Sequence, residues 1–244
     1  MTQTTCLLIG CPVDSGKRRP GCLMGPDAYR TAGLAEELAT LGHAVEDLGN
    51  LSPDPHQPDT GDGRLFKPNL TAAWTESLTR AAIEAMPRGL PIFLGGDHAL
   101  SLGTVAGAAA HAASVGRPLF VLWLDAHADF NTPATSPSGN MHGMPVACFC
   151  GETGFGSLFG DASRPSAAGV HADLHEHPTF QKFVHEIRSL YAMLLAVTKC
   201  PETADFEDQR AEASLALIHY LRRSHRHDLY TRYGFVAVWL CGCV

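Results

Sequence analysis

Short apolar runs alternate with longer segments of helical spacing over the first 125 residues of the chain. The apolar runs stop at glycine or aspartate, which is typical of buried strands that lead into loops. In the longer segments apolar residues recur three or four positions apart, as on one face of a helix. The predicted strands cover residues 5–10, 45–48, 89–94 and 117–125, and the predicted helices cover residues 26–41, 70–86 and 101–113. Apolar strands that alternate with helices predict an α/β fold with three layers, in which helices cover both faces of a parallel sheet.

The pattern changes after about residue 165. Apolar residues at helical spacing predict a long amphipathic helix over residues 180–195 and a second helix over residues 203–222. No alternation of strands and helices is visible in this part of the sequence. We therefore expect an α/β domain over residues 1–165, followed by a helical C-terminal segment over residues 166–244.

The composition is that of an ordinary globular protein, with 45% hydrophobic and 18% charged residues. The net charge of −7 lies almost wholly before residue 166, where 10 Lys and Arg residues stand against 16 Asp and Glu residues, so nucleic acid is not an expected partner. Eight cysteines are too dilute for a disulfide framework, and the first residues lack the features of a secretory signal. The apolar tail at 235–244 is shorter than the ~20 residues that cross a bilayer. We expect a soluble, cytoplasmic protein with no membrane partner.

Three side chains of metal-binding type follow the strand predicted at 117–125. In an extended chain, Asp125, His127 and Asp129 project to the same side, because side chains alternate with a period of two. His98 follows the preceding strand, and α/β sheets place their sites at the carboxyl ends of parallel strands. Carboxylates mixed with imidazoles suit Mn, Zn or Fe(II), and two metals can share one carboxylate. The plain alternative is a turn at the end of a strand, with solvated charges.

A loop rich in hydrogen-bonding side chains follows this motif, at residues 131–143. Asparagine, serine, threonine, proline and glycine are frequent in it, and such a loop can hold a polar substrate. By composition alone, an ordinary surface loop is an equal alternative.

The sequence resembles the arginases of the manganese-dependent ureohydrolase family over about two thirds of its length. The matching segments are residues 7–17, 25–34, 95–103, 125–129 and 138–146, and the likeness fades near residues 151–160. The metal motifs mark the superfamily as a whole. Asn-Thr-Pro at 131–133 with Ser-Gly-Asn-x-His-Gly at 138–143 points to arginase rather than agmatinase, whose substrate lacks the carboxylate.

The resemblance implies a site for two Mn²⁺ ions. His98 and Asp129 would bind the first ion, and His127 would bind the second. Asp125 would bridge the two ions, and Asp129 would also hold the bridging hydroxide. In such enzymes the two cations lower the pKa of a shared water, and the hydroxide attacks the guanidinium carbon of L-arginine to give L-ornithine and urea.

The resemblance also implies the residues that handle this substrate. Asn131 and Ser138 would bind its α-carboxylate, and Asn140 lies in the same loop and would assist. His142 would carry a proton to the leaving amine, a task that suits a histidine because its pKa lies near neutrality. The plain alternative for His142 is an ordinary residue of a surface loop. Family arginases often form trimers or hexamers, so a homo-oligomer is an open alternative to a monomer.

The sequence departs from the family in one respect. Arginases supply a later strand that ends in an Asp-x-Asp pair, and this pair completes both metal sites. The 244 residues contain no Asp-x-Asp. By the family pattern the first ion keeps three of its four protein ligands and the second keeps two, so we expect one ion, or weakly bound ions, and doubtful turnover.

The last third of the sequence allows several interpretations. Residues 206–233 have a faint likeness to a helical segment in the exchange domain of dedicator-of-cytokinesis proteins, and an unrelated pair of amphipathic helices is an equal alternative. The histidines at 171, 175 and 177 could bind a metal adventitiously, although a solvated segment is the plainer interpretation. Besides a working arginase, the sequence therefore allows an inactive arginase-like domain joined to a helical interaction module, or a truncated or mis-joined gene product.

Overall fold

The structure is a computed structural model of the 244-residue chain. It describes residues 4–60, 63–117, 119–123, 125, 127–156, 158–159 and 236–238. The chain divides into two units, residues 1–168 with 233–244 and residues 169–232, and every described residue belongs to the first. The helices predicted at 180–195 and 203–222, the histidines at 171–177 and the exchange-domain likeness lie outside the described residues. The boundary predicted at residue 165 stays a prediction.

Strands and helices alternate along the described chain as the apolar pattern predicts. The elements in chain order are β1 (Thr5–Cys11), α1 (Gly25–Thr31), α2 (Leu34–Thr40), β2 (Ala44–Asn50), α3 (Pro68–Ala85), β3 (Leu90–Gly95), α4 (Leu100–Ser114), β4 (Phe120–Leu122), the 3-10 helix η1 (Met141–Gly143), α5 (Pro145–Phe149) and β5 (Val236–Val238). The first three strands form a parallel sheet in the order β2-β1-β3. Because helices connect these parallel strands, the predicted α/β class is confirmed.

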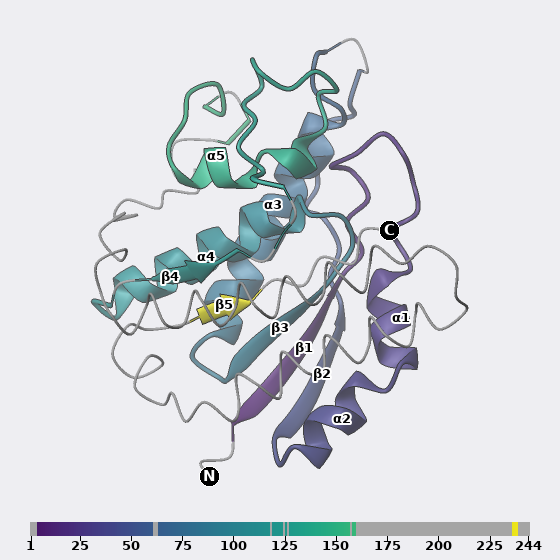
Figure 1. Ribbon diagram of the computed structural model, residues 1–244, viewed down its shortest axis with the longest axis vertical. Helices are drawn as coiled ribbons and strands as arrows, with labels where there is room; N and C mark the ends of the chain where they lie inside the picture. The colour runs from purple at the N-terminus through teal and green to yellow at the C-terminus, as the bar shows by residue number, and fades with distance from the viewer. Residues whose placement is uncertain are drawn as a thin grey trace. The chain divides into compact units, whose positions relative to one another are not determined.

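The central strand β1 is buried on both faces, and its side chains alternate between two hydrophobic clusters. Leu7 and Ile9 pack in the cluster that contains residues of α3 and α4. Cys6 and Leu8 pack in the cluster that includes Leu38 of α2. Figure 1 shows α1 and α2 on one side of the sheet and α3 and α4 on the other. This period-two division of the core confirms the predicted three layers.

Two details of the predicted elements differ in the structure. The helix predicted over residues 26–41 is divided into α1 and α2 at Gly33, which has a φ of 83°. Helical backbone cannot pass through a left-handed residue, yet the apolar spacing continues across the break. The edge strand β2 is mostly exposed rather than buried, and charged side chains such as Glu46 and Asp47 discourage further pairing there.

The strand predicted over residues 117–125 is shorter in the structure and has a partner that the sequence did not predict. It is reduced to β4, which pairs in parallel with β5 as a separate two-stranded sheet. The partner strand comes from the apolar tail at residues 235–244. A three-residue strand is too short to show a period, so only the three-dimensional structure reveals it.

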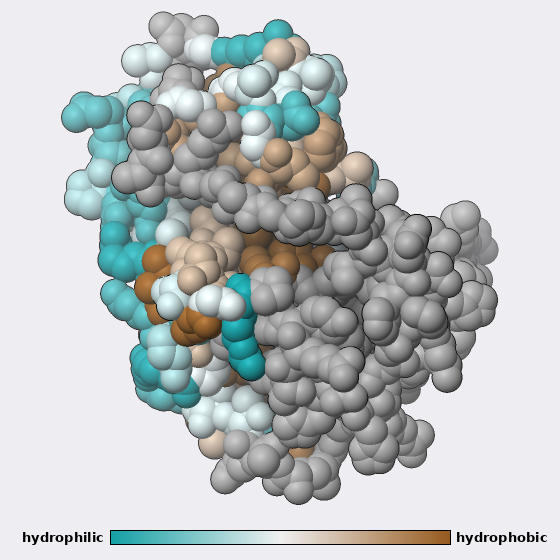
Figure 2. Space-filling view, turned by 90° about the vertical axis from the view of Figure 1, so that its left-hand side faces the viewer, coloured by the Kyte–Doolittle hydropathy of each residue, from teal (hydrophilic) through white to brown (hydrophobic). Residues whose placement is uncertain are grey.

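The surface of the described part is mixed in character. Figure 2 shows hydrophilic residues along one edge of this face and hydrophobic residues nearer its centre. Among the described residues, no helix has the length and apolar character that crossing a bilayer requires. The cytoplasmic location and the homo-oligomer stay predictions.

Candidate metal centre

The backbone at the carboxyl end of β3 passes very close to the loop that follows β1. The amide of Gly96 donates a hydrogen bond to the carbonyl of Cys11 at 3.2 Å, and the amide of Asp97 donates one to the carbonyl of Val13 at 2.8 Å. A Cβ on Gly96 would collide with the backbone of Val13. Glycine at position 96 therefore permits this close approach, and the chain that follows delivers His98 to the end of the sheet.

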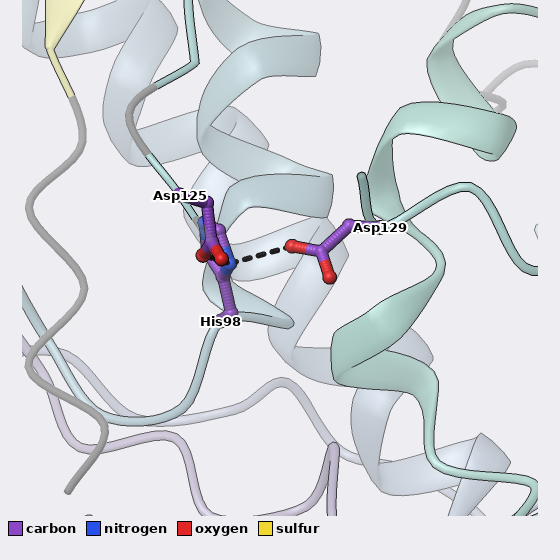
Figure 3. A group of neighbouring side chains, drawn as sticks. All are labelled: His98, Asp125 and Asp129. Carbon is purple, nitrogen blue, oxygen red and sulfur yellow. Dashed lines mark ion pairs between the residues drawn. The ribbon is translucent and has the colours of Figure 1, made fainter. Parts of the chain in front are cut away.

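Three of the four predicted metal ligands converge at this edge. Nδ1 of His98 lies 2.9 Å from Oδ2 of Asp125 and 2.8 Å from Oδ2 of Asp129. The three potential ligand atoms lie within 4.8 Å of one another. Figure 3 shows His98 and Asp125 side by side, with Asp129 pointing toward them from the neighbouring segment. The sequence positions 98, 125 and 129 thus form one compact group.

The polar atoms of this group fit a divalent cation. Oδ2 of Asp129 is buried and forms no hydrogen bond with the described residues, although Nδ1 of His98 lies near it. Nε2 of His98 is also buried and has no hydrogen-bond partner among the described residues. Buried polar atoms without hydrogen bonds are costly unless another ligand satisfies them. One imidazole nitrogen and two carboxylate oxygens are a donor set that Mn²⁺ accepts.

His127 occupies a different position from the other three. Its side chain is 83% exposed, against 7% for His98 and 7% for Asp129. Its backbone amide donates a hydrogen bond to Oδ1 of Asp125 at 2.8 Å, and its Nδ1 lies 3.2 Å from the same oxygen. The structure therefore brings two of the three motif side chains into the group, and it leaves His127 beside Asp125 in solvent.

The segment from Asp125 to Asp129 is not extended, since the chain bends at His127. The φ of Asp129 is 47°, in the left-handed region that non-glycine residues rarely adopt. Its carbonyl accepts hydrogen bonds from the amides of Val146, at 3.1 Å, and Ala147, at 3.4 Å, in the first turn of α5. Strained backbone of this kind persists where the surrounding structure fixes it, and it is frequent at functional sites.

Two residues near His98 were given no role by the sequence analysis. The indole ring of Trp123 stacks on the His98 ring, with centroids 4.5 Å apart and an interplanar angle of 19°. Asp97 is fully buried and accepts hydrogen bonds from the amides of Gly16, at 2.7 Å, and Ala99, at 2.9 Å. The Gly-Gly-Asp-His motif contained Asp97, but nothing in the sequence indicated which amides it would meet.

The predicted substrate residues lie in one loop beside this group. The amide of Asn131 donates a hydrogen bond to the carbonyl of Gly143 at 3.1 Å. A Cβ on Gly143 would lie 3.9 Å from Oδ1 of Asp129 and 4.0 Å from Nδ2 of Asn131, so both side chains lie next to Gly143. Oγ of Ser138 accepts a hydrogen bond from the amide of Asn140 at 3.2 Å.

His142 lies in η1 and is partly buried. Its amide donates a hydrogen bond to the carbonyl of Gly16 at 3.0 Å, which ties η1 to the β1–α1 loop. Burial lowers the pKa of the His142 imidazole below its ordinary value of 6.5, the charge of Asp129 opposes this shift, and Lys17 adds to it. The ring is therefore mainly neutral at neutral pH and can accept a proton.

Comparison with known proteins places this site in a family. The family model described as the arginase family matches residues 4–188. The arginase of Agrobacterium fabrum is 51% identical over 157 residues, which cover 63% of this chain and 48% of that protein. The arginase of Brucella melitensis is 48% identical over 161 residues, which cover 66% of this chain and 53% of that protein. The chain spans about half the length of the curated relatives it matches.

Solved structures agree with this comparison. The arginase from Bacillus caldovelox aligns with a TM-score of 0.54 and 42% identity, over 60% of this chain and 48% of that one. The arginase from Entamoeba histolytica, solved in complex with L-ornithine, aligns with a TM-score of 0.57 and 30% identity, over 68% of this chain and 55% of that one. The family match covers more than half of the 244 residues and includes His98, Asp125 and Asp129. The chain belongs to the arginase family.

Proposed function

We propose that this chain is an arginase-type amidinohydrolase that converts L-arginine to L-ornithine and urea with the help of Mn²⁺. The observation that carries the proposal is the convergence of His98, Asp125 and Asp129 at the carboxyl end of the sheet, in a chain of the arginase family. The proposal concerns the whole activity, while the matched relatives extend well beyond the part that this chain covers.

His98, Asp125 and Asp129 would hold the first cation, and His127 with Asp125 would hold the second. When bound, such cations supply a hydroxide at neutral pH by lowering the pKa of water. Oδ1 and Oδ2 of Asp125 face the two histidines separately, at 3.2 Å from His127 and 2.9 Å from His98. This arrangement supports the bridging role proposed for Asp125, since each carboxylate oxygen already lies beside a different imidazole.

The neighbouring loop would bind the amino acid part of the substrate. Asn131 lies beside Asp129, and Ser138 and Asn140 lie further along the same loop, so this loop would hold the α-carboxylate while the guanidinium group reaches the metal centre. His142 would take up a proton as a neutral base and pass it to the leaving amine. Its lowered pKa supports this order, because only the neutral ring can accept the proton first.

A second candidate function is the binding of one cation without turnover. It is favoured by the exposed position of His127, whose side chain must be ordered before it can hold a second ion. The first cation would then bind at His98, Asp125 and Asp129 alone. The two candidates differ in metal content and in urea release.

The test combines both measurements on the purified 244-residue chain. After dialysis against Mn²⁺, we expect one tightly bound ion per chain, a second that binds only at higher Mn²⁺ concentration, and urea release from L-arginine above a blank that contains metal alone. Asp129→Asn is the control, since it keeps the size of the side chain but removes one carboxylate charge. One retained ion without urea release would favour the second candidate. No retained manganese and no urea would reject the metallohydrolase proposal.

A further inference from the structure

Hydrogen bonds join the loop between β1 and α1 to the proposed carboxylate-binding loop, and Arg18 makes two of them. The backbone amide of Arg18 donates a hydrogen bond to Oδ1 of Asn140 at 3.2 Å. Its side-chain Nε donates another to the carbonyl of Ser138, also at 3.2 Å. A further hydrogen bond joins the Gly16 carbonyl to the amide of His142. Arg18 therefore contacts both Ser138 and Asn140, two of the residues proposed to hold the α-carboxylate.

The position of the Arg18 guanidinium group is fixed from a second side. Its Cζ lies 5.1 Å from the centroid of the Phe66 ring, a cation–π distance. The amide of Phe66 donates a hydrogen bond to the carbonyl of Gly139 at 2.9 Å, so the ring is itself attached to the same loop segment. A flexible arginine would lose much entropy when it orders around a ligand. These contacts hold the guanidinium group of Arg18 beside the loop before any ligand arrives.

The two terminal nitrogens of Arg18 are free to meet a ligand. In the part of the chain that the structure describes, Nε makes the side-chain hydrogen bond of Arg18, and neither Nη atom has a partner. The residue is exposed. Arg64 also contacts this loop, but its Nη2 donates to the carbonyls of Ala134 and Ser136. Arg18 differs because it presents guanidinium N–H groups without hydrogen bonds next to Ser138, while its backbone amide holds Asn140.

We propose that Arg18 determines specificity for the carboxylate of the substrate. The inference rests on the proposed function and names a residue of the same site. A guanidinium group beside hydroxyl and amide donors attracts and orients a carboxylate, because hydrogen bonds between charged partners are stronger than neutral ones. Arg18 therefore favours amidine substrates that carry a carboxylate, such as L-arginine, over those that lack it, such as agmatine.

The experiment compares Arg18→Gln and Arg18→Lys with the unsubstituted chain, all loaded with Mn²⁺. Binding of L-arginine and of agmatine is measured as the KM of urea release, or by titration calorimetry where a chain binds without turnover. We expect Arg18→Gln to weaken L-arginine binding about fivefold, the size of one exposed ion pair, and to leave agmatine binding unchanged. Arg18→Lys keeps the charge and should retain most of the affinity. Arg88→Gln is the control, because it removes one positive charge next to the opposite end of β3. It should leave the affinities for both ligands unchanged.

Each outcome either supports or overturns the inference. An equal loss for both ligands would show that Arg18 only braces the loop, and no loss for L-arginine would show that its charge plays no part. Where agmatine binds too weakly to measure, the salt dependence of L-arginine binding decides: it must be smaller in Arg18→Gln than in the unsubstituted chain. If the unsubstituted chain neither binds nor hydrolyses L-arginine, the proposed function fails first, and the inference fails with it.

Discussion

His98 and His127 both lie within 3.2 Å of Asp125, but the structure holds them in different ways. The His98 ring is buried, stacks on Trp123 and is followed directly by α4. The His127 ring is 83% exposed, and within the described part of the chain His127 contacts Asp125, two positions earlier. One imidazole is placed by the core of the fold, and the other is placed by a local turn at the surface.

This difference indicates which half of the site is preorganised for a cation. Binding at His98 requires little further ordering, because packing has already fixed the ring and the two carboxylates that face it. Binding at His127 must also immobilise an exposed side chain, which costs conformational entropy. We therefore expect a strong first site at His98 and a weaker second site at His127, in the metal affinities of the unsubstituted chain.

The largest expected effect comes from removing ligands at the buried half. His98→Asn and Asp129→Asn should each lower the affinity for the first Mn²⁺ ion by at least ~100-fold, since even residues outside the ligand shell change metal affinity by 10- to 100-fold. Equilibrium dialysis with metal analysis measures this loss. His127→Asn is the matched variant and should leave the first affinity within about threefold. If His127→Asn were as damaging as His98→Asn, the distinction between the two halves would be wrong.

The next effect concerns the close backbone approach that positions His98. Gly96→Ala places a Cβ against the backbone of Val13, and backbone cannot yield as a flexible side chain can. We expect the free energy of unfolding in urea to fall by about 2 kcal/mol or more, within the range found for overpacked sites. Gly143→Ala is the control, because its Cβ would meet ordinary contacts of 3.9 and 4.0 Å. Equal free energies of unfolding for both variants would show that the backbone contact between Gly96 and Val13 is less tightly packed than we infer.

Trp123 offers a smaller test of the same half. Trp123→Leu removes the ring that stacks on His98 and leaves the metal-binding atoms in place. Because aromatic pairs contribute about 0.5–1.5 kcal/mol, the affinity for the first Mn²⁺ ion should fall about two- to tenfold. The bound metal is measured by elemental analysis after dialysis, because the variant lacks the Trp123 indole and its fluorescence cannot be compared with that of the unsubstituted chain. An unchanged affinity would mean that α4 and the β3 end suffice to orient His98.

Much of this site could be predicted from the sequence, and the remainder depends on backbone conformation. The apolar runs located β1 and β3, and the position of His98 after the second of these runs placed it at the carboxyl end of the sheet. The group of Asp125, His127 and Asp129 was predicted on the assumption of an extended chain. The structure ends β4 at Leu122 and bends the chain at Asp129, where φ is 47°. No period in the sequence indicates such a left-handed residue, and stacking on Trp123 requires tertiary contacts.

His142 provides the smallest test, between the two extremes of burial. Its pKa is lower in the folded chain than the ordinary 6.5, so the unfolded chain binds more protons as the pH falls below about 6.5. The contribution of His142 to the free energy of unfolding is therefore unaffected above this pH and becomes increasingly unfavourable below it, toward its folded pKa. Urea unfolding of the metal-free chain between pH 7.5 and 5 measures this slope, over a range of roughly 2.5 pH units around the histidine pKa.

The variant His142→Asn isolates this contribution, because every other group titrates in both chains. We expect the stability of the unsubstituted chain to fall more steeply with decreasing pH than that of His142→Asn, and we expect the two curves to run parallel above pH ~7. A steeper fall in the variant would mean that the attraction of Asp129 outweighs burial and raises the pKa of His142. That result would make the resting imidazole of His142 cationic at mildly acidic pH, and it would remove the support for His142 as a neutral base.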